Sequence, residues 1–585
     1  MEIKRIKMEH ILAIIIFLTV ILHIGELNQI CIIDDEFGYW GTAAFFAGYD
    51  WTGLSGTSPY YGYGLSFFYT ILFMLFSNPV IMYKAAIILN AIFLVVAYYI
   101  SLHCAWKLCP DMDRKYQCLL CFLIALYPNT IVQSQITWTE SLLYLWFWVL
   151  FSLVISISER ADMGKLIVFG CLLVYGIMVH QRTLGVFVSG ILFITFLVFS
   201  GHNRIRICLP AFVSVCLMLL LFLKIKGWLQ DNFWMTLDVE IQEMNNFSGQ
   251  ISKIKNMFSL QGITEFSSSV IAKALYLSIS TCLLIFPAFF CMICSIWKYI
   301  LCWIKERKVD YSGEVSVCLF VLCSSATTFI ISSVFMQQWS YRADTLLYGR
   351  YNEFVIGPVL MIGLITGYKN KNWISKSLYL IILILNMALI VYAILNFHNF
   401  TAFHSTNATA LGVFLGRDYL IRDGILPAVF IALTVMGIVS FWCNKRFRKI
   451  QGLLLAILVV YLALWKDAII YNNQLTYNMQ EYYMDNTFDV AKLVEKRKDT
   501  GVIYVLDDDT PLTIQTDLYD RNIKYIQFYL YNRKIECQKY SDIYDKETEN
   551  YYIVRKASGA YEKFMQNIKW KQRLIYCNNL YGLFY

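Results

Sequence analysis

Residues 10–40 have the sequence HILAIIIFLTVILHIGELNQICIIDDEFGYW, and this stretch decides the fold. Its first part, residues 10–27, is almost entirely apolar and is close to the length that an α-helix needs to cross a bilayer. No small-residue cleavage site follows this run, so it predicts a membrane span rather than a cleaved signal. Three consecutive acids, Asp34, Asp35 and Glu36, come shortly after it.

Apolar runs of this kind recur from Ile11 to Leu464. The 585-residue chain is 58% hydrophobic and 15% charged, whereas soluble domains are roughly 25% charged. This composition excludes disordered, collagen-like, nucleic-acid-binding and ordinary cytosolic proteins, and it predicts a polytopic α-helical membrane protein. We expect about thirteen transmembrane helices, at approximately 10–27, 84–106, 117–133, 139–157, 166–180, 184–200, 209–226, 269–297, 314–335, 354–368, 377–396, 424–442 and 450–466.

The charged residues divide the chain into two parts. Residues 467–585 hold 16 Lys/Arg and 17 Asp/Glu in 119 positions, which is typical of a water-soluble domain. We therefore expect a transmembrane body over residues 1–466 and a small α/β domain over residues 467–585. Capping and alternation signals predict its elements: helices at Asn486–Lys498 and Tyr561–Ile568, strands at Val502–Leu506, Tyr525–Leu530 and Tyr551–Val554, and a pairing of Leu574–Cys577 with Leu583–Tyr585.

Basic residues predict the orientation. The loop at 28–83 contains no Lys or Arg, whereas 21 of the body's 33 basic residues lie in seven stretches that thirteen spans place on one side: 1–9, 105–117, 158–165, 201–207, 298–308, 369–376 and 444–449. Because basic loops stay in the cytoplasm, we predict a multi-pass plasma-membrane protein with a cytoplasmic N-terminus. The first outer loop and the extracytoplasmic domain at 467–585 then face outward. Aromatic segments at 35–47 and 60–76 are expected to form helices in the headgroup region.

Charged residues at the outer ends of the spans are the candidate site residues, because charges near a bilayer are costly and usually functional. The candidate catalytic acids are Asp35, Glu36 and Glu140. Each of them would equally serve as a helix cap. The candidate substrate-binding residues are Tyr39, His180, Arg182, Arg342, Arg350 and Tyr351. An arginine fork matches phosphate oxygens, although simple snorkelling also explains an arginine at this depth.

The order of these residues resembles that of a known family. Asp35-Glu36-Phe37-Gly38-Tyr39 matches the Asp-Glu-x-x-Tyr motif that members of the GT-C superfamily of membrane glycosyltransferases carry in their first outer loop. Glu140 stands where they have an acid in the second outer loop. The segment from Pro59 to Lys84 is similar to their interfacial helix, with Lys84 in place of their usual Arg. The chain most resembles protein O-mannosyltransferases and the lipid A aminoarabinose transferase, mainly over residues 1–200.

The resemblance implies a GT-C-like fold and transfer of a sugar from a polyprenyl-phosphate donor to a glycan, lipid or protein acceptor on the outer face of the membrane. It implies that Asp35 is catalytic, and we expect Asp35 to act as the general base in an inverting reaction. Glu140 would orient the acceptor, and the arginines would neutralise the leaving phosphate. We expect no required cofactor, although the resemblance is compatible with a divalent metal held by Asp35 and Glu140. No nucleic-acid partner is expected.

Three other functions fit parts of the sequence. A flippase for lipid-linked sugars would need internal repeats and charges near mid-membrane, and the expected spans have neither. An outer-face glycan polymerase or ligase would not need the acids of the first loop. A non-catalytic scaffold would need no particular carboxylate. The domain at 467–585 is a candidate for acceptor recognition only because of the side on which it is expected.

Overall fold

The computed structural model describes most of the chain, and every structural statement below refers to the described residues. These are 7–22, 24–25, 27–30, 33–56, 58, 60–199, 205–235, 242–243, 248–306, 313–336, 346–369, 376–397, 409, 425, 429, 432–437, 481–496, 500–509, 522–543 and 549–585. The predicted span at 450–466 and most of the one at 424–442 lie outside them, as does the candidate substrate-binding residue Arg342.

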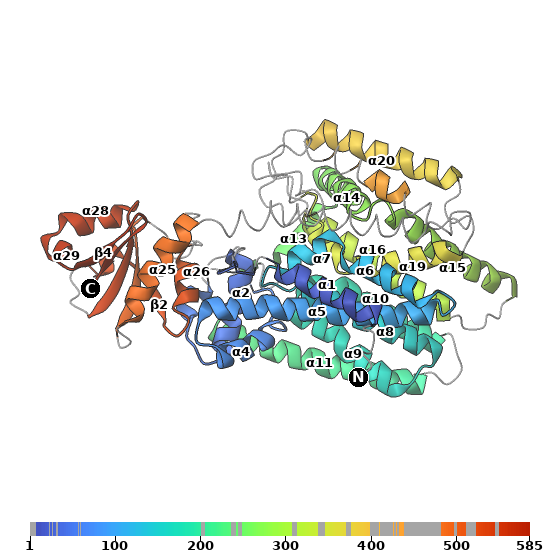
Figure 1. Ribbon diagram of the computed structural model, residues 1–585, viewed down its shortest axis with the longest axis horizontal. Coiled ribbons are helices and arrows are strands. Elements are labelled where there is room, and N and C mark those ends of the chain that lie inside the picture. Colours follow the sequence, from blue (N-terminus) through green and yellow to red (C-terminus); the bar gives the residue numbers. More distant parts are fainter. Residues whose placement is uncertain are drawn as a thin grey trace, which may run out of the picture.

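Long apolar helices make up the body (Figure 1). Within the described ranges six are long and apolar enough to cross a membrane: α5 (Pro79–Leu108), α8 (Glu140–Glu159), α10 (Leu184–Phe199) with the preceding 3-10 turn η1 (Gln181–Thr183), α11 (Ile205–Asn232), α15 (Ile285–Glu306) and α16 (Gly313–Phe335). Other apolar helices are α1 (Met8–Ile21), α9 (Met163–Val179), α19 (Ile356–Lys369) and α20 (Lys376–Phe397). The polytopic helical fold is therefore confirmed, but the number of thirteen spans is not.

The predicted span at 269–297 is two helices. The first, α14 (Leu260–Ser280), ends in a turn at which Cys282 and Leu283 have φ angles of 51° and 65°, and α15 begins directly after it. Positive φ is unfavourable for residues other than glycine, so the packing around the turn must hold it. The hydropathy pattern predicted one span here because the residues of the turn are as apolar as their neighbours.

The predicted span at 117–133 is also divided. Here α6 (Arg114–Ala125) and α7 (Pro128–Ser134) are separated at Tyr127, whose backbone is extended with φ −49° and ψ 126°. The residue before a proline is kept out of the helical region by the proline ring. Helix α7 ends at Ser134, and residues 135–139 form a loop that leads into α8. Glu140 is therefore the first residue of α8.

The segment predicted to be the first outer loop contains α2 (Ile33–Phe46), α3 (Thr52–Ser55) and α4 (Ser66–Leu75). Helices are present in both segments predicted to be interfacial, but their surroundings differ. Every residue of α2 from Glu36 to Ala44 is buried, so protein covers this helix on all sides over that stretch. In contrast, α4 exposes Ile71, Met74 and Leu75, as expected of a helix with one apolar face toward lipid.

The predicted small α/β domain is present at the C-terminal end. Its five-stranded sheet has the order β2-β1-β3-β5-β4. The strands are β1 (Gly501–Leu506), β2 (Ile535–Lys539), β3 (Asn550–Arg555), β4 (Leu574–Cys577) and β5 (Tyr581–Phe584). The helices are α25 (Glu481–Glu495), α26 (Asn522–Tyr529), α27 (Tyr540–Ile543), α28 (Gly559–Gln566) and α29 (Ile568–Gln572). β1 is parallel to β2 and β3, whereas β5 is antiparallel to β3 and β4, which confirms the predicted closing pair.

The predicted strand at Tyr525–Leu530 is wrong, because most of this segment is α26. Its β-branched and aromatic residues favour a strand by composition. However, the buried residues Ile523, Ile526 and Leu530 recur at spacings of three and four, which is the helical period. The strand that takes its place in the sheet is β2, which was missed because its sequence IECQK is mostly polar.

The two faces of the sheet have different neighbours. Ile503 and Val505 point into a small core with Phe564 of α28 and Trp570 of α29. The alternate residues of β1 belong to the core that continues through α26 into the membrane body. Figure 1 shows the domain beside the end of α5 that also carries α2 and α4. The domain is therefore packed onto the first outer loop.

Basic segments gather at the opposite end of α5. Arg114 pairs with Glu9 at 2.9 Å, Lys107 pairs with Glu159, and Lys369 donates to the Leu108 carbonyl at 2.9 Å. These contacts join four of the seven basic stretches that the sequence predicted to share one side.

Candidate functional site

Four charged side chains meet near the end of the body that carries the C-terminal domain. Asp35 lies in the first turn of α2, Glu140 is the first residue of α8, and Arg182 is the central residue of η1. Arg350 is the first residue of α18 (Arg350–Glu353). Asp35 and Arg350 are 315 positions apart in the chain, so only the packing of the helices brings them together.

The guanidinium of Arg350 joins the two carboxylates. Its Nη1 donates to Asp35 Oδ2 at 2.7 Å, and its Nε donates to Glu140 Oε1. Arg182 Nη2 donates to the same Glu140 oxygen at 2.7 Å. Two negative and two positive charges therefore balance, as charges buried in a protein must to avoid a large desolvation cost.

Aromatic rings line this cluster. The Arg350 Cζ lies 3.5 Å from the centroid of the Trp138 ring, and the Arg182 Cζ lies 5.1 Å from that of Tyr351. Stacked rings stabilise a guanidinium that has lost its water. Burial by itself would lower the pKa of Arg350, but the neighbouring Glu140 and, more weakly, Asp35 raise this pKa well above its ordinary value. Arg350 is thus a fixed positive charge.

Asp35 is the accessible member of the cluster. Its side chain is 20% exposed, against 6% for Glu140, 3% for Arg350 and 2% for Arg182. Arg182 Nε and Nη1, together with Glu140 Oε2, are buried and have no hydrogen-bond partner in the part of the chain that the structure describes. The arrangement therefore combines a partly exposed carboxylate with buried arginine donors that have no hydrogen-bond partner among the described residues.

Glu36 has a different environment from Asp35. It is fully buried. Its Oε1 accepts from the Thr137 backbone N at 2.8 Å, from the Thr137 hydroxyl at 2.6 Å and from the Tyr83 hydroxyl at 3.1 Å. These bonds tie α2 to α5 and to the loop before α8. The catalytic role expected for Glu36 stays a prediction, and its contacts are those of a group that holds elements together.

The three remaining candidate binding residues lie beside the cluster. His180 Nδ1 accepts from the Arg182 backbone N at 3.1 Å, and its ring packs between Tyr61 and Tyr351 at centroid distances of 5.7 and 5.9 Å. His180 therefore orients the turn that carries Arg182. Tyr39 is buried, and this burial raises the pKa of its phenol far above its ordinary value, so the hydroxyl stays neutral.

The residues do not fit a metal shared by Asp35 and Glu140. A divalent cation bound by both would have to replace the guanidinium of Arg350, which bonds to each of them. Elsewhere in the described ranges no three His, Cys, Asp or Glu residues gather in a metal-binding group. We therefore derive no step through a metal.

Two buried ionisable residues that the sequence analysis missed, Glu353 and Lys273, support the segment that carries Arg350. The hydroxyls of Tyr127, at 3.0 Å, and Tyr276 donate to Glu353 Oε1, and Lys273 Nζ donates to the Leu346 carbonyl at 3.1 Å. Both sets of bonds hold the segment at 346–353. Burial raises the pKa of Glu353 to about 8, so this carboxyl is protonated at neutral pH. A lysine inside the predicted span at 269–297 was the signal available for Lys273.

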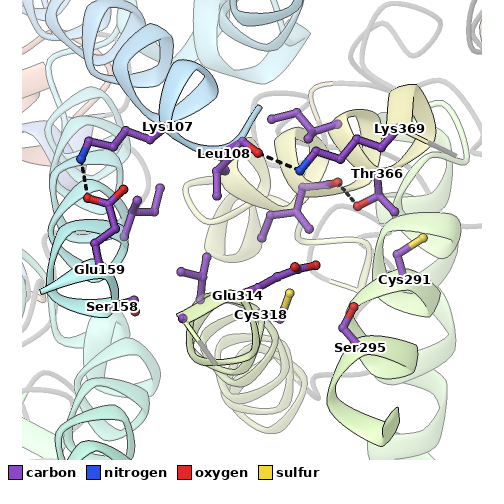
Figure 2. Close-up of a pocket in the computed structure, with 15 residues that line it drawn as sticks. Lys107, Leu108, Ser158, Glu159, Cys291, Ser295, Glu314, Cys318, Thr366 and Lys369 are labelled. Carbon is purple, nitrogen blue, oxygen red and sulfur yellow. Dashed lines mark hydrogen bonds and ion pairs between the residues drawn. The ribbon is translucent and has the colours of Figure 1, made fainter. Parts of the chain in front are cut away.

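A cavity of about 470 Å³ lies at the other end of the body. Figure 2 shows its rim, where Lys107 meets Glu159 and Lys369 meets Leu108. Glu159 ends the 20-residue helix that Glu140 begins, so the cavity is roughly 30 Å from the charged cluster. No candidate site residue lines it.

The chain matches no family model and no curated protein. Its backbone is similar to two structures of ArnT from Cupriavidus metallidurans. One has undecaprenyl phosphate bound (TM-score 0.48, 9% identity) and one is in the apo state (TM-score 0.49, 11% identity), and each match covers 98% of this chain and 97% of that chain. An oligosaccharyltransferase from Archaeoglobus fulgidus tethered with an acceptor peptide also matches, with a TM-score of 0.40 and 10% identity, over 90% of this chain and 63% of that chain.

ArnT is the lipid A aminoarabinose transferase, one of the enzymes that the first-loop motif resembles, and both neighbours are members of the GT-C superfamily. All three likenesses have TM-scores below 0.5.

Proposed function

We propose that this protein is a membrane glycosyltransferase that moves a sugar from a polyprenyl-phosphate donor to an acceptor on the outer face of the membrane. The observation that carries the proposal is the cluster of Asp35, Glu140, Arg182 and Arg350. It holds one carboxylate that a substrate can reach, beside two buried guanidinium groups.

The outer-face assignment rests on the distribution of charge. The cluster and the C-terminal domain lie toward one end of the body, and the Lys/Arg-rich stretches meet at the other. Basic loops mark the cytoplasmic side of membrane proteins. We therefore propose a plasma-membrane protein whose N-terminus is cytoplasmic and whose site and C-terminal domain are extracytoplasmic.

Asp35 acts as the general base in the proposed reaction. Its carboxylate accepts the proton of an acceptor hydroxyl while the acceptor oxygen attacks the anomeric carbon of the donor sugar. The bond from that carbon to the phosphate oxygen breaks, and the polyprenyl phosphate leaves with the bonding electrons. Attack opposite the leaving group inverts the anomeric configuration. A positioned base typically contributes about 10²–10⁴-fold to the rate.

The arginines stabilise the departing phosphate. Arg182 Nε and Nη1 have no partner among the described residues, so they can bind the oxygens that gain charge as the bond breaks. Glu140 holds both guanidinium groups at one carboxylate oxygen. Its proposed role is to place the arginines, and this agrees with its burial.

A transfer assay tests the proposal. Membranes containing the wild type, Asp35→Asn or Asp50→Asn receive a panel of labelled polyprenyl-phosphate sugars. Asp50 is the matched control, because it is also an ion-paired aspartate of the first outer loop, bonded to Lys534 at 3.4 Å. We expect transfer by the wild type and the control, and a loss of about 10²–10⁴-fold in Asp35→Asn. Full activity in Asp35→Asn would instead favour a polymerase or ligase that does not use this acid.

A further inference from the structure

Helix α26 of the C-terminal domain is inserted against the helix that carries Asp35. Phe528 is 1% exposed, and its ring meets the rings of Trp40 and Tyr83 edge-on at centroid distances of 5.2 and 6.3 Å. Lys524, which is also buried, donates to the Ser58 hydroxyl at 2.9 Å. The contact is therefore an interior one that involves both an apolar and a charged side chain.

Trp40 and Tyr83 both belong to the hydrogen-bond network around Glu36. Tyr83 donates its hydroxyl to Glu36 Oε1 at 3.1 Å. Trp40 Nε1 donates at 2.9 Å to the hydroxyl of Thr137, which in turn donates to the same Glu36 oxygen at 2.6 Å. Two independent routes thus run from Phe528 to the residue next to Asp35.

We propose that Phe528 is a positioning residue for α2, and that the C-terminal domain is part of the transferase site rather than a separable module for acceptor recognition. The inference rests on the proposed function for its effect on the rate, but not for its effect on α2. Asp35 must sit where its oxygen reaches an acceptor proton, and a misplacement of about 1 Å costs about 100-fold in rate. A side chain that sets the position of α2 therefore changes turnover without touching a substrate.

Two substitutions in one domain separate this role from general domain stability. Phe528→Ala removes the ring that packs on α2. Phe564→Ala is the matched control, because Phe564 is also fully buried but lies on the other face of the sheet, 4.6 Å from Trp570 and 4.7 Å from Phe584 between ring centroids. If Phe528→Ala does not fold, Phe528→Val, which removes the ring but leaves a small apolar side chain, is compared with Phe564→Val in the same way.

The first readout is hydrogen exchange of the α2 peptide in the purified full-length protein, which needs no substrate. We expect faster exchange over Ile33–Phe46 in Phe528→Ala than in the wild type, and wild-type exchange there in Phe564→Ala. Exchange in α2 that Phe528→Ala leaves unchanged, or that both variants raise equally, would overturn the proposal. This comparison decides the positioning of α2 even if the wild type transfers no sugar.

The second readout is the kinetics of transfer. We expect kcat of Phe528→Ala to fall about 10- to 100-fold with KM for the acceptor unchanged, because the base is displaced while the acceptor contacts remain. Phe528→Leu, which keeps an apolar side chain of similar size, should recover most of this loss. A raised KM for the acceptor with an unchanged kcat would mean that the domain recognises the acceptor, and it would refute the positioning role.

Discussion

The charge balance of the cluster makes a quantitative prediction for Glu140→Gln. Glu140 Oε1 accepts from Arg182 and Arg350, and all three side chains are 6% exposed or less. The substitution keeps the size of the side chain but removes one negative charge. Asp35 then faces two buried guanidinium groups alone, so the cluster carries an uncompensated positive charge.

The expected cost follows from the burial of these groups. Breaking a buried ion pair by removing one partner typically costs about 3–5 kcal/mol. We therefore expect Glu140→Gln to lower the free energy of unfolding by about 3 kcal/mol or more. Equilibrium unfolding in mixed micelles of rising SDS content, followed by tryptophan fluorescence, measures this difference.

The same helix supplies the matched control. Glu159 ends α8 and pairs with Lys107, but its side chain is 47% exposed and that of Lys107 is 26% exposed. Exposed ion pairs contribute about 0–1 kcal/mol, so Glu159→Gln should change the free energy of unfolding by less than about 1 kcal/mol.

A double substitution tests the reason for the cost. Glu140→Gln combined with Arg182→Gln restores a balance of one aspartate and one arginine. Residues that share an ion pair show interaction energies of about 0.5–3 kcal/mol. The double variant should therefore be more stable than the sum of the single effects predicts. Strict additivity, or a Glu140→Gln protein as stable as Glu159→Gln, would refute the reasoning.

Three further predictions concern separate parts of the molecule. Burial raises the pKa of Glu353 to about 8 in the folded protein, against an ordinary value of 4.5. Between these two pH values the unfolded chain binds fewer protons than the folded protein, so stability falls as the pH rises. The fall in thermal stability from pH 6 to pH 9 should therefore be smaller in Glu353→Gln than in the wild type. Gly62 has φ +149°, and a Cβ there would lie 2.4 Å from the Val179 carbonyl, so thermal unfolding should show Gly62→Ala destabilised by more than about 1 kcal/mol, whereas Gly227→Ala, with open space at that position, should not be destabilised. Cys577 is exposed on the C-terminal domain, so a membrane-impermeant maleimide should label the protein in intact cells, and labelling should be lower in Cys577→Ser. Labelling of Cys577 only after permeabilisation would contradict the proposed orientation.

Local patterns in the sequence predicted most of the elements. The apolar runs marked α8, α9, α10 and α16 to within a few residues, because hydrophobic length is a direct consequence of bilayer thickness. Breaks inside apolar stretches were missed, as at Cys282, because hydropathy does not register a change of backbone direction. The strand predicted at Tyr525–Leu530 failed for a related reason, since composition favoured a strand while the spacing of the buried residues was helical.

The sequence predicted which residues belong to the candidate site, but not how they are arranged. Asp35, Glu140, Arg182 and Arg350 were all selected individually from their positions at span ends. Which acid meets which arginine was not predictable, because these pairings join residues up to 315 positions apart. Glu353 was overlooked because its importance comes from two tyrosine hydroxyls on distant segments, that of Tyr127 between α6 and α7 and that of Tyr276 on α14.

The sequence by itself determined that this chain is a helical membrane protein with a small α/β domain at its C-terminal end, and it singled out the acids and arginines of the candidate site. These properties follow from local composition. The length of an apolar helix is set by the thickness of the bilayer, and a charge near the bilayer costs free energy whatever the rest of the fold. Only the tertiary structure decided that Asp35 is reachable while the adjacent Glu36 is buried, that Arg350 joins two carboxylates, and that α26 packs against α2. Whether a residue is buried or paired depends on its neighbours in the folded protein, and those neighbours come from distant parts of the chain.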